Sequence, residues 1–394
     1  MPYDFDTVPN RRNTYSSKWD AMEKLFGRSD LLPLWVADMD FLLPPELEEA
    51  IEHRLKQGVL GYTTVLPSFS QSIVDWLANR HGWQIENDWI LFAPNVVFAV
   101  NTAITAFTEP GDRIVVQPPV YQPLYRSIIR NGRQVVYNPL KISGSRYEMD
   151  LEDLAEKLKT PTRMLLLCSP HNPVGRVWEQ EELIALIDLC RSHDVMIVSD
   201  EIHFDLVFEG YRHTPTAMLD AEAARNTITL SSPSKTFNIP GIHISYVIIS
   251  EPEARRRYGE RMRDIGISNP GLFGIVATEA AYNSCSGWLD ELLDYLRGNL
   301  QYLLGFLGDR LPFIRPFKPE GTCLVWIDFR KLGLDDKDLK SFLIQKAGLG
   351  FSEGSMFGPG GQGFQRMNIG CPRSLLEQAL LQLERACADL AFKR

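Results

Sequence analysis

The segment TITLSSPSKTFN, residues 227–238, is the stretch on which the prediction of the fold depends. Its apolar first half is typical of a buried strand, and Lys235 follows among small hydroxyl residues. A lysine at a strand end could form a Schiff base with an aldehyde cofactor while Ser232 and Ser234 bind a phosphate. A solvated serine-rich turn would show the same pattern, so the segment needs support from the rest of the chain.

Other short apolar runs flank this segment on both sides in the sequence. They lie at residues 113–116, 163–168, 195–198 and 245–249, and a helical pattern at 181–191 separates two of them. Runs that are apolar at nearly every position are typical of strands covered on both faces. We therefore predict an α/β fold with three α/β/α layers around a mostly parallel sheet, and a ligand site at the carboxyl ends of its strands.

The sequence pattern divides the chain into three parts. Residues 1–44 are rich in Pro, Asn and Arg and are expected to form an irregular amino-terminal arm. Residues 45–285 contain the predicted sheet and are expected to form a large, cofactor-binding domain. Residues 286–394 open on a long helical pattern, continue with a strand at 323–327 and end on an amphipathic helix, which predicts a smaller α+β domain to which the arm contributes.

Composition argues against several classes of partner. Lys plus Arg is 41 and Asp plus Glu is 50, a net charge of −9, so no broad basic field is expected to attract nucleic acid or an anionic membrane. The six cysteines are far apart and include no CxxC pair, which indicates reduced thiols and a cytoplasmic protein. No signal peptide or long apolar run is found, and His193 and His203 lack the spacing of metal ligands.

Polar side chains follow the predicted strands at the points where they end. Asn172 comes after the run that ends at Cys168, Asp200 and His203 come after the next run, and Lys235 comes after the third. The carboxyl ends of parallel strands meet at one edge of a sheet. If these strands are neighbours, we expect an amide, a carboxylate, a histidine and a lysine to lie in one cleft.

Such a cleft suits a pyridine-aldehyde phosphate cofactor, because each part of that molecule needs a different protein group. An acid whose pKa stays low would keep the ring nitrogen protonated, a role for Asp200. Asn172 and His203 could bond the ring hydroxyl, and Tyr121, which follows another strand, could stack on the ring.

The phosphate of such a cofactor is expected at the start of a helix. Backbone N–H groups near Val96 and Val97 could bind it together with the hydroxyls of Ser232 and Ser234. Taken singly, each of these residues also fits an ordinary role in a turn, a helix cap or the core. Their combination is what favours a cofactor site.

The chain resembles the fold-type I pyridoxal-phosphate enzymes, the aspartate aminotransferase superfamily, nearly from end to end. The resemblance lies in the series Asn172-Pro173-x-Gly175, Ser199-Asp200-Glu201, Ser232-x-Ser234-Lys235 and Arg366. The chain is also similar to the MalY/PatB branch of C–S β-lyases in segments 34–41, 61–63, 199–203, 234–239 and 367–373.

This resemblance implies a role for each matching residue. Lys235 would carry pyridoxal 5'-phosphate and move the substrate's α-proton, with Asp200 at the ring nitrogen and Tyr121 on the ring face. Asn172 would bond the ring hydroxyl and lie beside the substrate. Arg366 would grip the substrate's α-carboxylate, for which a guanidinium fork is well shaped. Without this context, a surface ion pair would be the simpler interpretation of that arginine.

Two further residues are implied to complete the site. Ala37, in the segment 34–41, is expected beside the substrate together with Tyr121. Tyr62 would reach the phosphate of the other subunit, because active sites in this superfamily are built at the interface of a homodimer. The resemblance therefore implies a dimer with shared active sites.

Two departures from the aminotransferase pattern bear on the reaction. His243 stands eight residues after Lys235, where many aminotransferases carry an arginine, and His203 stands three residues after Asp200, where they often carry a tyrosine. We expect α,β-elimination from L-cystathionine or a related L-cysteine S-conjugate, which yields a thiol, pyruvate and ammonia. An aminotransferase is the alternative, and a regulatory protein on the same fold is a third possibility.

Overall fold

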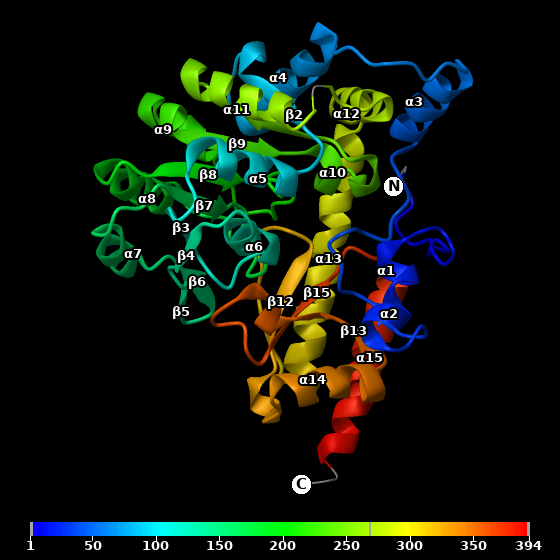
Figure 1. The fold of residues 1–394 in the computed structure, drawn as a ribbon. Helices are drawn as coiled ribbons and strands as arrows, with labels where there is room; N and C mark the ends of the chain where they lie inside the picture. The colour runs from blue at the N-terminus through cyan, green and yellow to red at the C-terminus, as the bar shows by residue number, and fades with distance from the viewer. Residues whose placement is uncertain (1–2, 268, 392–394) are drawn as a thin grey trace.

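A seven-stranded sheet forms the centre of the computed structural model, which describes residues 3–267 and 269–391 (Figure 1). β10 runs antiparallel to both of its neighbours, and the other neighbouring strands are parallel. The predicted fold with a mostly parallel sheet is confirmed. In spatial order the strands are β2 (Ile90–Ala93), β10 (Ser245–Ile248), β9 (Thr227–Ser231), β8 (Met196–Asp200), β7 (Met164–Cys168), β3 (Arg113–Val116) and β4 (Gln134–Tyr137).

Both faces of this sheet are covered, as its apolar strands require. In β7, Met164 and Leu166 belong to one hydrophobic cluster, and Leu165 and Leu167 belong to another. Successive side chains of a strand point to opposite faces, so the two clusters are the two layers of the core. The first cluster contains residues of α5 (Val96–Phe107), α6 (Gln122–Arg130) and α11 (Pro252–Asp264), and the second those of α7 (Leu151–Leu158) and α8 (Gln180–Ser192).

Further helices lie beside the sheet and at the ends of its strands. α12 packs against both α3 and α4, and the short α10 follows β9 directly. No helix in the described ranges is long and apolar enough to cross a membrane. The bounds are α3 (Pro45–Lys56), α4 (Pro67–His81), α9 (Ala221–Asn226), α10 (Pro233–Thr236) and α12 (Leu272–Ser284), and β5 (Lys141–Ser143) pairs with β6 (Arg146–Glu148).

The carboxyl-terminal part contains a second, antiparallel sheet. Its strands are β11 (Arg315–Phe317), β12 (Leu324–Asp328), β15 (Phe364–Asn368) and β14 (Ser352–Glu353), in that spatial order. The long helix α13 (Ser286–Arg310) runs from the level of the large sheet down to α14 (Asp336–Phe342), and α15 (Arg373–Ala391) lies alongside it (Figure 1). The predicted strand at 323–327 and the two predicted helices are present.

The amino-terminal arm is less irregular than expected. It contains α1 (Ser17–Asp20), α2 (Met22–Phe26) and the short strand β1 (Leu32–Pro33), which pairs with β13 (Leu349–Gly350). The expectation of an irregular arm was wrong here because long-range burial, absent from the local pattern, stabilises these turns: Met22 packs with Leu31 and Ile344. The domain boundaries at residues 45 and 286 stay predictions.

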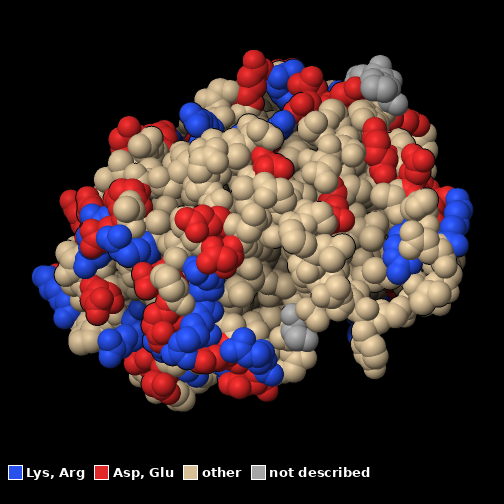
Figure 2. All heavy atoms as spheres, turned by 90° about the horizontal axis from the view of Figure 1, so that it is seen from above, with Lys and Arg blue, Asp and Glu red and all other residues tan. Residues whose placement is uncertain are grey.

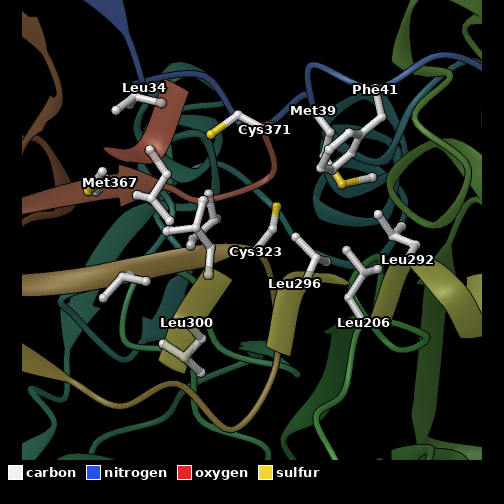
Figure 3. Packing of buried hydrophobic residues seen from close by; sticks show 14 of the residues in the cluster. Leu34, Met39, Phe41, Leu206, Leu292, Leu296, Leu300, Cys323, Met367 and Cys371 are labelled. Atoms are coloured by element: carbon white, nitrogen blue, oxygen red, sulfur yellow. The ribbon is translucent and has the colours of Figure 1, made fainter. Parts of the chain in front are cut away.

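One hydrophobic cluster joins the arm, α13 and the second sheet. Figure 3 shows side chains from all three regions pointing toward one another. Hydrogen bonds from Lys235 and Asn238, which follow β9, to residues 37–41 also hold the arm at the carboxyl end of that strand. The labelled residues include Leu34, Met39 and Phe41 of the arm, Leu292, Leu296 and Leu300 of α13, and Cys323, Met367 and Cys371 around the second sheet.

Candidate active site

A cavity of about 460 Å³ lies at the carboxyl ends of β3, β7, β8 and β9. Polar side chains that follow separate strands meet there, as expected for an α/β sheet. The second sheet and the arm close its other side. Of the residues predicted from the sequence, the lining contains Ala37, Val96, Val97, Tyr121, Asn172, Asp200, His203, Ser232, Ser234, Lys235 and Arg366.

Tyr62 is the predicted site residue that does not line this cavity. It is fully exposed (110%) in the loop between α3 and α4. The chain therefore does not bring Tyr62 into its own cavity. The expected contact with the phosphate in another subunit stays a prediction.

Lys235 lies in the single turn of α10, which begins directly after β9. Ser232 caps this turn, because its Oγ accepts a hydrogen bond from the backbone N–H of Ser234 at 3.0 Å. The Nζ of Lys235 donates to the carbonyl oxygen of Ala37 at 3.0 Å. Burial lowers the pKa of Lys235 below its ordinary value. The amine is thus closer to its neutral, nucleophilic form at neutral pH than an exposed lysine would be.

Asp200 ends β8 and is buried in the floor of the cavity. One of its oxygens accepts from the backbone N–H of Ile202 at 3.2 Å. Burial, assisted by the neighbouring Glu201, raises the pKa of Asp200 to about 7. The expectation that this pKa stays low was wrong for the protein alone, because among the described residues the carboxylate accepts only from the N–H of Ile202 and has little solvent around it. A cationic N–H group beside it would favour the ionised form.

The neighbouring ring side chains are held in uncharged forms. The Nδ1 atom of His203 is buried without a hydrogen-bond partner among the described residues. Burial, with help from Lys235 and Arg366, lowers the pKa of His203 to about 3. Burial and the nearby Asp200 raise the pKa of Tyr121. His203 is therefore a neutral imidazole, and Tyr121 a neutral phenol, at physiological pH.

Arg366 reaches the cavity from β15 with its guanidinium buried. Its Nη1 donates to Oδ1 of Asn172 at 2.9 Å, and its Nη2 donates to the carbonyl oxygen of Trp35 at 2.7 Å and to Oγ of Ser352 at 3.2 Å. Its Nε has no partner, and no carboxylate within the described ranges forms an ion pair with it. Burial lowers the pKa of Arg366 to about 10, so it stays cationic at neutral pH. The interpretation as a surface ion pair is wrong.

The start of α5 also lines the cavity. Asn95 caps this helix by accepting from the backbone N–H of Phe98 at 2.8 Å. The N–H groups of Val96 and Val97 belong to the first turn and have no acceptor within the helix, which suits an anion. Ser232 is less available than expected, because its hydroxyl donates to the carbonyl oxygen of Ile244 at 2.5 Å.

Sequence reasoning missed two residues that hold Arg366. Ser352 lies in the two-residue strand β14, and Phe357 places its ring 5.0 Å from the guanidinium carbon of Arg366. Neither residue stands in a local pattern that points to a ligand. Only the pairing of β14 with β15 brings Ser352 beside Arg366, so no sequence signal could have found it.

Comparisons with known proteins place this architecture in the class of aminotransferase-fold proteins. The chain belongs to the family "Aminotransferase class I and II", whose model matches residues 29–383. It is 42% identical to cystathionine beta-lyase PatB of Bacillus subtilis over 97% of this chain and 99% of that protein. It is 35% identical to protein MalY of Escherichia coli over 97% of this chain and 98% of that protein.

A solved structure agrees with these sequence matches. Cystalysin from Treponema denticola, which contains a pyridoxal 5'-phosphate cofactor, superposes with a TM-score of 0.96 at 39% identity. The match covers 99% of this chain and 100% of the cystalysin chain. The predicted resemblance to the aspartate aminotransferase superfamily and to its MalY/PatB branch is confirmed.

The raised pKa of Asp200 predicts a pH-dependent stability in protein prepared without ligand. Its folded pKa of about 7 lies above the ordinary value of 3.8 expected in the unfolded chain, so its contribution to stability is present below about pH 4 and lost as pH rises through 7. We expect the melting temperature of Asp200→Asn, relative to that of the wild type, to rise between pH 4 and 8. Thermal melts at several pH values test this, with Asp188→Asn as an exposed control; parallel curves for Asp200→Asn and wild type would contradict it.

Proposed function

We propose that this protein is a pyridoxal-phosphate-dependent C–S β-lyase acting on L-cystathionine or related L-cysteine S-conjugates. The name of PatB and the match over nearly the whole chain support this activity. The observation that carries the proposal is the buried, unpaired guanidinium of Arg366 in the same cavity as the buried amine of Lys235. Together they can hold an α-carboxylate and take the proton from the neighbouring carbon.

The chemistry of the cavity fits pyridoxal 5'-phosphate. Asp200 is a buried carboxylate that lacks a cationic partner, His203 has an orphaned ring nitrogen, and the first turn of α5 presents N–H groups. Asp200 would face the ring nitrogen, Asn172 the ring hydroxyl and Tyr121 the ring face, with Val96, Val97 and Ser234 at the phosphate. When bound, the cofactor supplies an aldehyde carbon that amines attack and a ring that withdraws electrons from the substrate's α-carbon.

Lys235 has two tasks in the proposed reaction. Its Nζ is the amine that would hold the aldehyde carbon, and after the substrate amine replaces it, the freed Nζ accepts the proton of the substrate's α-carbon. Burial supports both tasks because it lowers the pKa of Lys235 and keeps part of the amine neutral. The carbonyl of Ala37, which accepts from this Nζ, orients the amine within the cavity.

Arg366 binds and orients the substrate through its α-carboxylate. The hydrogen bonds that Arg366 makes all go to uncharged oxygens, and its Nε–H has no partner among the described residues. Its positive charge is therefore available to a carboxylate of the substrate. Holding the carboxylate fixes the α-carbon and its β-carbon relative to Lys235. Because Arg366 donates to Oδ1 of Asn172, this amide contacts the substrate-binding arginine as well as the proposed cofactor site.

The overall reaction consumes one water and breaks one carbon–sulfur bond. R–S–CH₂–CH(NH₃⁺)–COO⁻ and water give R–SH, pyruvate and ammonium, with the β-carbon's electron pair leaving on sulfur. In aminotransfer the substrate's α-proton would instead return to the cofactor carbon. A keto acid would then be needed to accept the amino group. The neutral His203 and the exposed His243 at the cavity rim, in place of the tyrosine and arginine of many aminotransferases, support elimination.

A product assay separates the two reactions. With L-cystathionine and no keto acid, we expect one free thiol for each pyruvate over many turnovers; with L-alanine, we expect neither. The measurements are thiol titration, coupled pyruvate detection and the absorbance of the cofactor. Turnover that requires a keto acid acceptor would refute the lyase and favour the aminotransferase. Absence of turnover with all thioethers and amino acids would favour the regulatory alternative.

Replacing the proposed catalytic lysine tests its two tasks. Lys235→Ala is expected to lower kcat by about a thousandfold or more, because nucleophile and base are both lost. It should also abolish the borohydride-reducible link between cofactor and protein, read by mass spectrometry. Lys159→Ala, at an exposed lysine, is the control and should retain both. A reducible link found at another lysine in Lys235→Ala would refute the assignment.

We also propose that the protein forms a homodimer with shared active sites. The loop between α3 and α4 exposes an unusual run of large apolar side chains: Val59, Leu60, Tyr62, Val65 and Leu66. Thr63 anchors the loop, because its Oγ1 donates to the carbonyl oxygen of Pro270 at 2.8 Å. Figure 2 shows a face whose middle is mostly uncharged and carries a few acidic side chains, with the densest charge at the lower left and further charges at the top and right. Such surface supports burial against a second copy, in which Tyr62 would reach the partner's phosphate site.

A charge in this loop should dissociate the proposed dimer. We expect Leu60→Glu to sediment as a monomer and to bind pyridoxal phosphate about tenfold more weakly, because a buried carboxylate is costly and Tyr62 is withdrawn. Ile142→Glu, at an exposed residue of β5, is the control and should leave the oligomeric state unchanged. A wild-type protein that sediments as a monomer at micromolar concentration would contradict the proposal.

A cytoplasmic location completes the proposal. All six cysteines are buried and free, which supports a reducing compartment. Cell fractionation tests it: recovery of the protein with an extracellular or membrane fraction would oppose it.

A further inference from the structure

Residues 35–41 of the arm form a bent segment without regular secondary structure, here called the carbonyl ribbon, two of whose carbonyl oxygens bond side chains of the active site. The carbonyl of Trp35 accepts from Arg366 at 2.7 Å and from Ser352 at 2.7 Å. The carbonyl of Ala37 accepts from Lys235 at 3.0 Å. The two side chains proposed to bind the carboxylate and to move the proton are thus both oriented by backbone atoms of one short segment.

Two asparagines, Asn368 and Asn238, fix the path of the carbonyl ribbon. Nδ2 of Asn368 donates to the carbonyls of Val36 and Asp38 at 2.6 and 2.8 Å. Asn238 donates to the carbonyl of Met39 at 2.9 Å and accepts from its backbone N–H at 2.8 Å. These bonds tie the ribbon to the end of β15 and to the turn after α10.

A buried ionic cluster centred on Asp40 also holds the ribbon. The carboxylate of Asp40 accepts from Nζ of Lys18 at 2.6 Å, from Nη1 of Arg11 at 2.7 Å and from Nε1 of Trp19 at 2.8 Å. Lys18 and Asp40 are essentially inaccessible to solvent (0% and 1%). Arg11 also pairs with Asp38, so two cations and two carboxylates balance in charge.

The donors of this cluster also bind the ribbon's backbone. Lys18 donates to the carbonyl of Asp38 at 3.0 Å, and Arg11 donates to the carbonyl of Met39 at 3.1 Å. Asp40 therefore orients the very donors that grip the peptide units next to Ala37. A buried charge cannot relax into solvent, so the cluster defines one position for the ribbon.

We propose that Asp40 is a positioning residue, which acts through Lys18 and Arg11 to hold the carbonyl ribbon and thereby aligns Arg366 and Lys235 for the substrate. The inference rests on the proposed lyase function. It separates substrate alignment from most of cofactor binding: of the groups proposed to hold the cofactor, Lys235 bonds the ribbon, whereas Asp200, Ser234 and the start of α5 have no hydrogen bond to it among the described residues. Loss of Asp40 should weaken the hold on substrate while cofactor affinity is preserved.

The primary test is Asp40→Asn in the cofactor-loaded enzyme, with Asp30→Asn as control because Asp30 forms an exposed ion pair in the same arm. We expect KM for an L-cysteine thioether to rise about tenfold and kcat to fall less, since a misplaced guanidinium loses charge-assisted bonds. The dissociation constant of pyridoxal phosphate should change by less than about twofold. Hydrogen exchange of a peptide spanning residues 35–41 should accelerate in Asp40→Asn alone.

A second variant separates positioning from folding stability. Lys18→Met with Asp40→Leu replaces the buried pair by apolar side chains of similar size, which often restores stability. We expect its melting temperature to recover toward that of the wild type while KM stays high, because the Lys18 donor to the ribbon is absent and Arg11 is no longer oriented by Asp40. If Asp40→Asn fails to fold, the KM of this double variant tests the proposal instead.

The outcomes distinguish the inference from the proposed function. Unchanged KM in Asp40→Asn, or recovery of KM together with stability in the double variant, would overturn the positioning role. Loss of cofactor affinity in proportion to the rise in KM would also overturn it. A wild-type enzyme that releases no thiol from any thioether would instead refute the lyase activity, and hydrogen exchange at residues 35–41 would still test how Asp40 holds the ribbon.

Discussion

The buried guanidinium of Arg366 is the constraint to which the rest of the site is adapted. A cation removed from water needs either a carboxylate or several hydrogen bonds, and Arg366 has the second without the first. Its acceptors are Asn172 after β7 of the large sheet, Trp35 of the arm and Ser352 of β14 in the second sheet. Because each acceptor is uncharged, the positive charge stays available to a bound anion, and the three regions must keep one arrangement to satisfy it.

Lys235 shares the same cavity, so two basic groups face one space. Burial lowers the pKa of both, and each lowers the pKa of the neighbouring His203. A ligand that brings a carboxylate and a phosphate would relieve this excess of positive charge. The same ligand would give Asp200 the cationic partner that it lacks in the protein alone. Binding is therefore expected to stabilise the fold as well as to start the chemistry.

Much of the fold could be predicted because its signals are local. β7 and β8 are apolar nearly throughout, and the alternation of their side chains between two hydrophobic clusters explains that pattern. Asn172, Asp200 and Lys235 were predicted to meet because parallel strands end at one edge. Arg366 was placed by resemblance alone, since it comes from a separate sheet. The role of each of these residues stays a proposal, whereas their convergence is a property of the structure.

Other features could not be predicted, because they depend on pairs distant in the sequence. The turns of α1 and α2 form where Met22 and Lys18 are buried by residues that their own pattern does not reveal. The pKa of Asp200 depends on how much solvent and how many donors surround it, and no sequence pattern specifies either.

By itself, the sequence determined the sheet, the order of the polar residues along it and the kind of chemistry they favour, since apolar periodicity and motif spacing are local. The tertiary structure alone decided that the carbonyls of Ala37 and Trp35 accept hydrogen bonds from Lys235 and Arg366, and that the buried Asp40 lies in the same segment. Every residue type has a backbone carbonyl, so hydrogen bonds to backbone atoms hardly constrain which residue stands at a position. The partners of a buried charge come together only when the chain has folded.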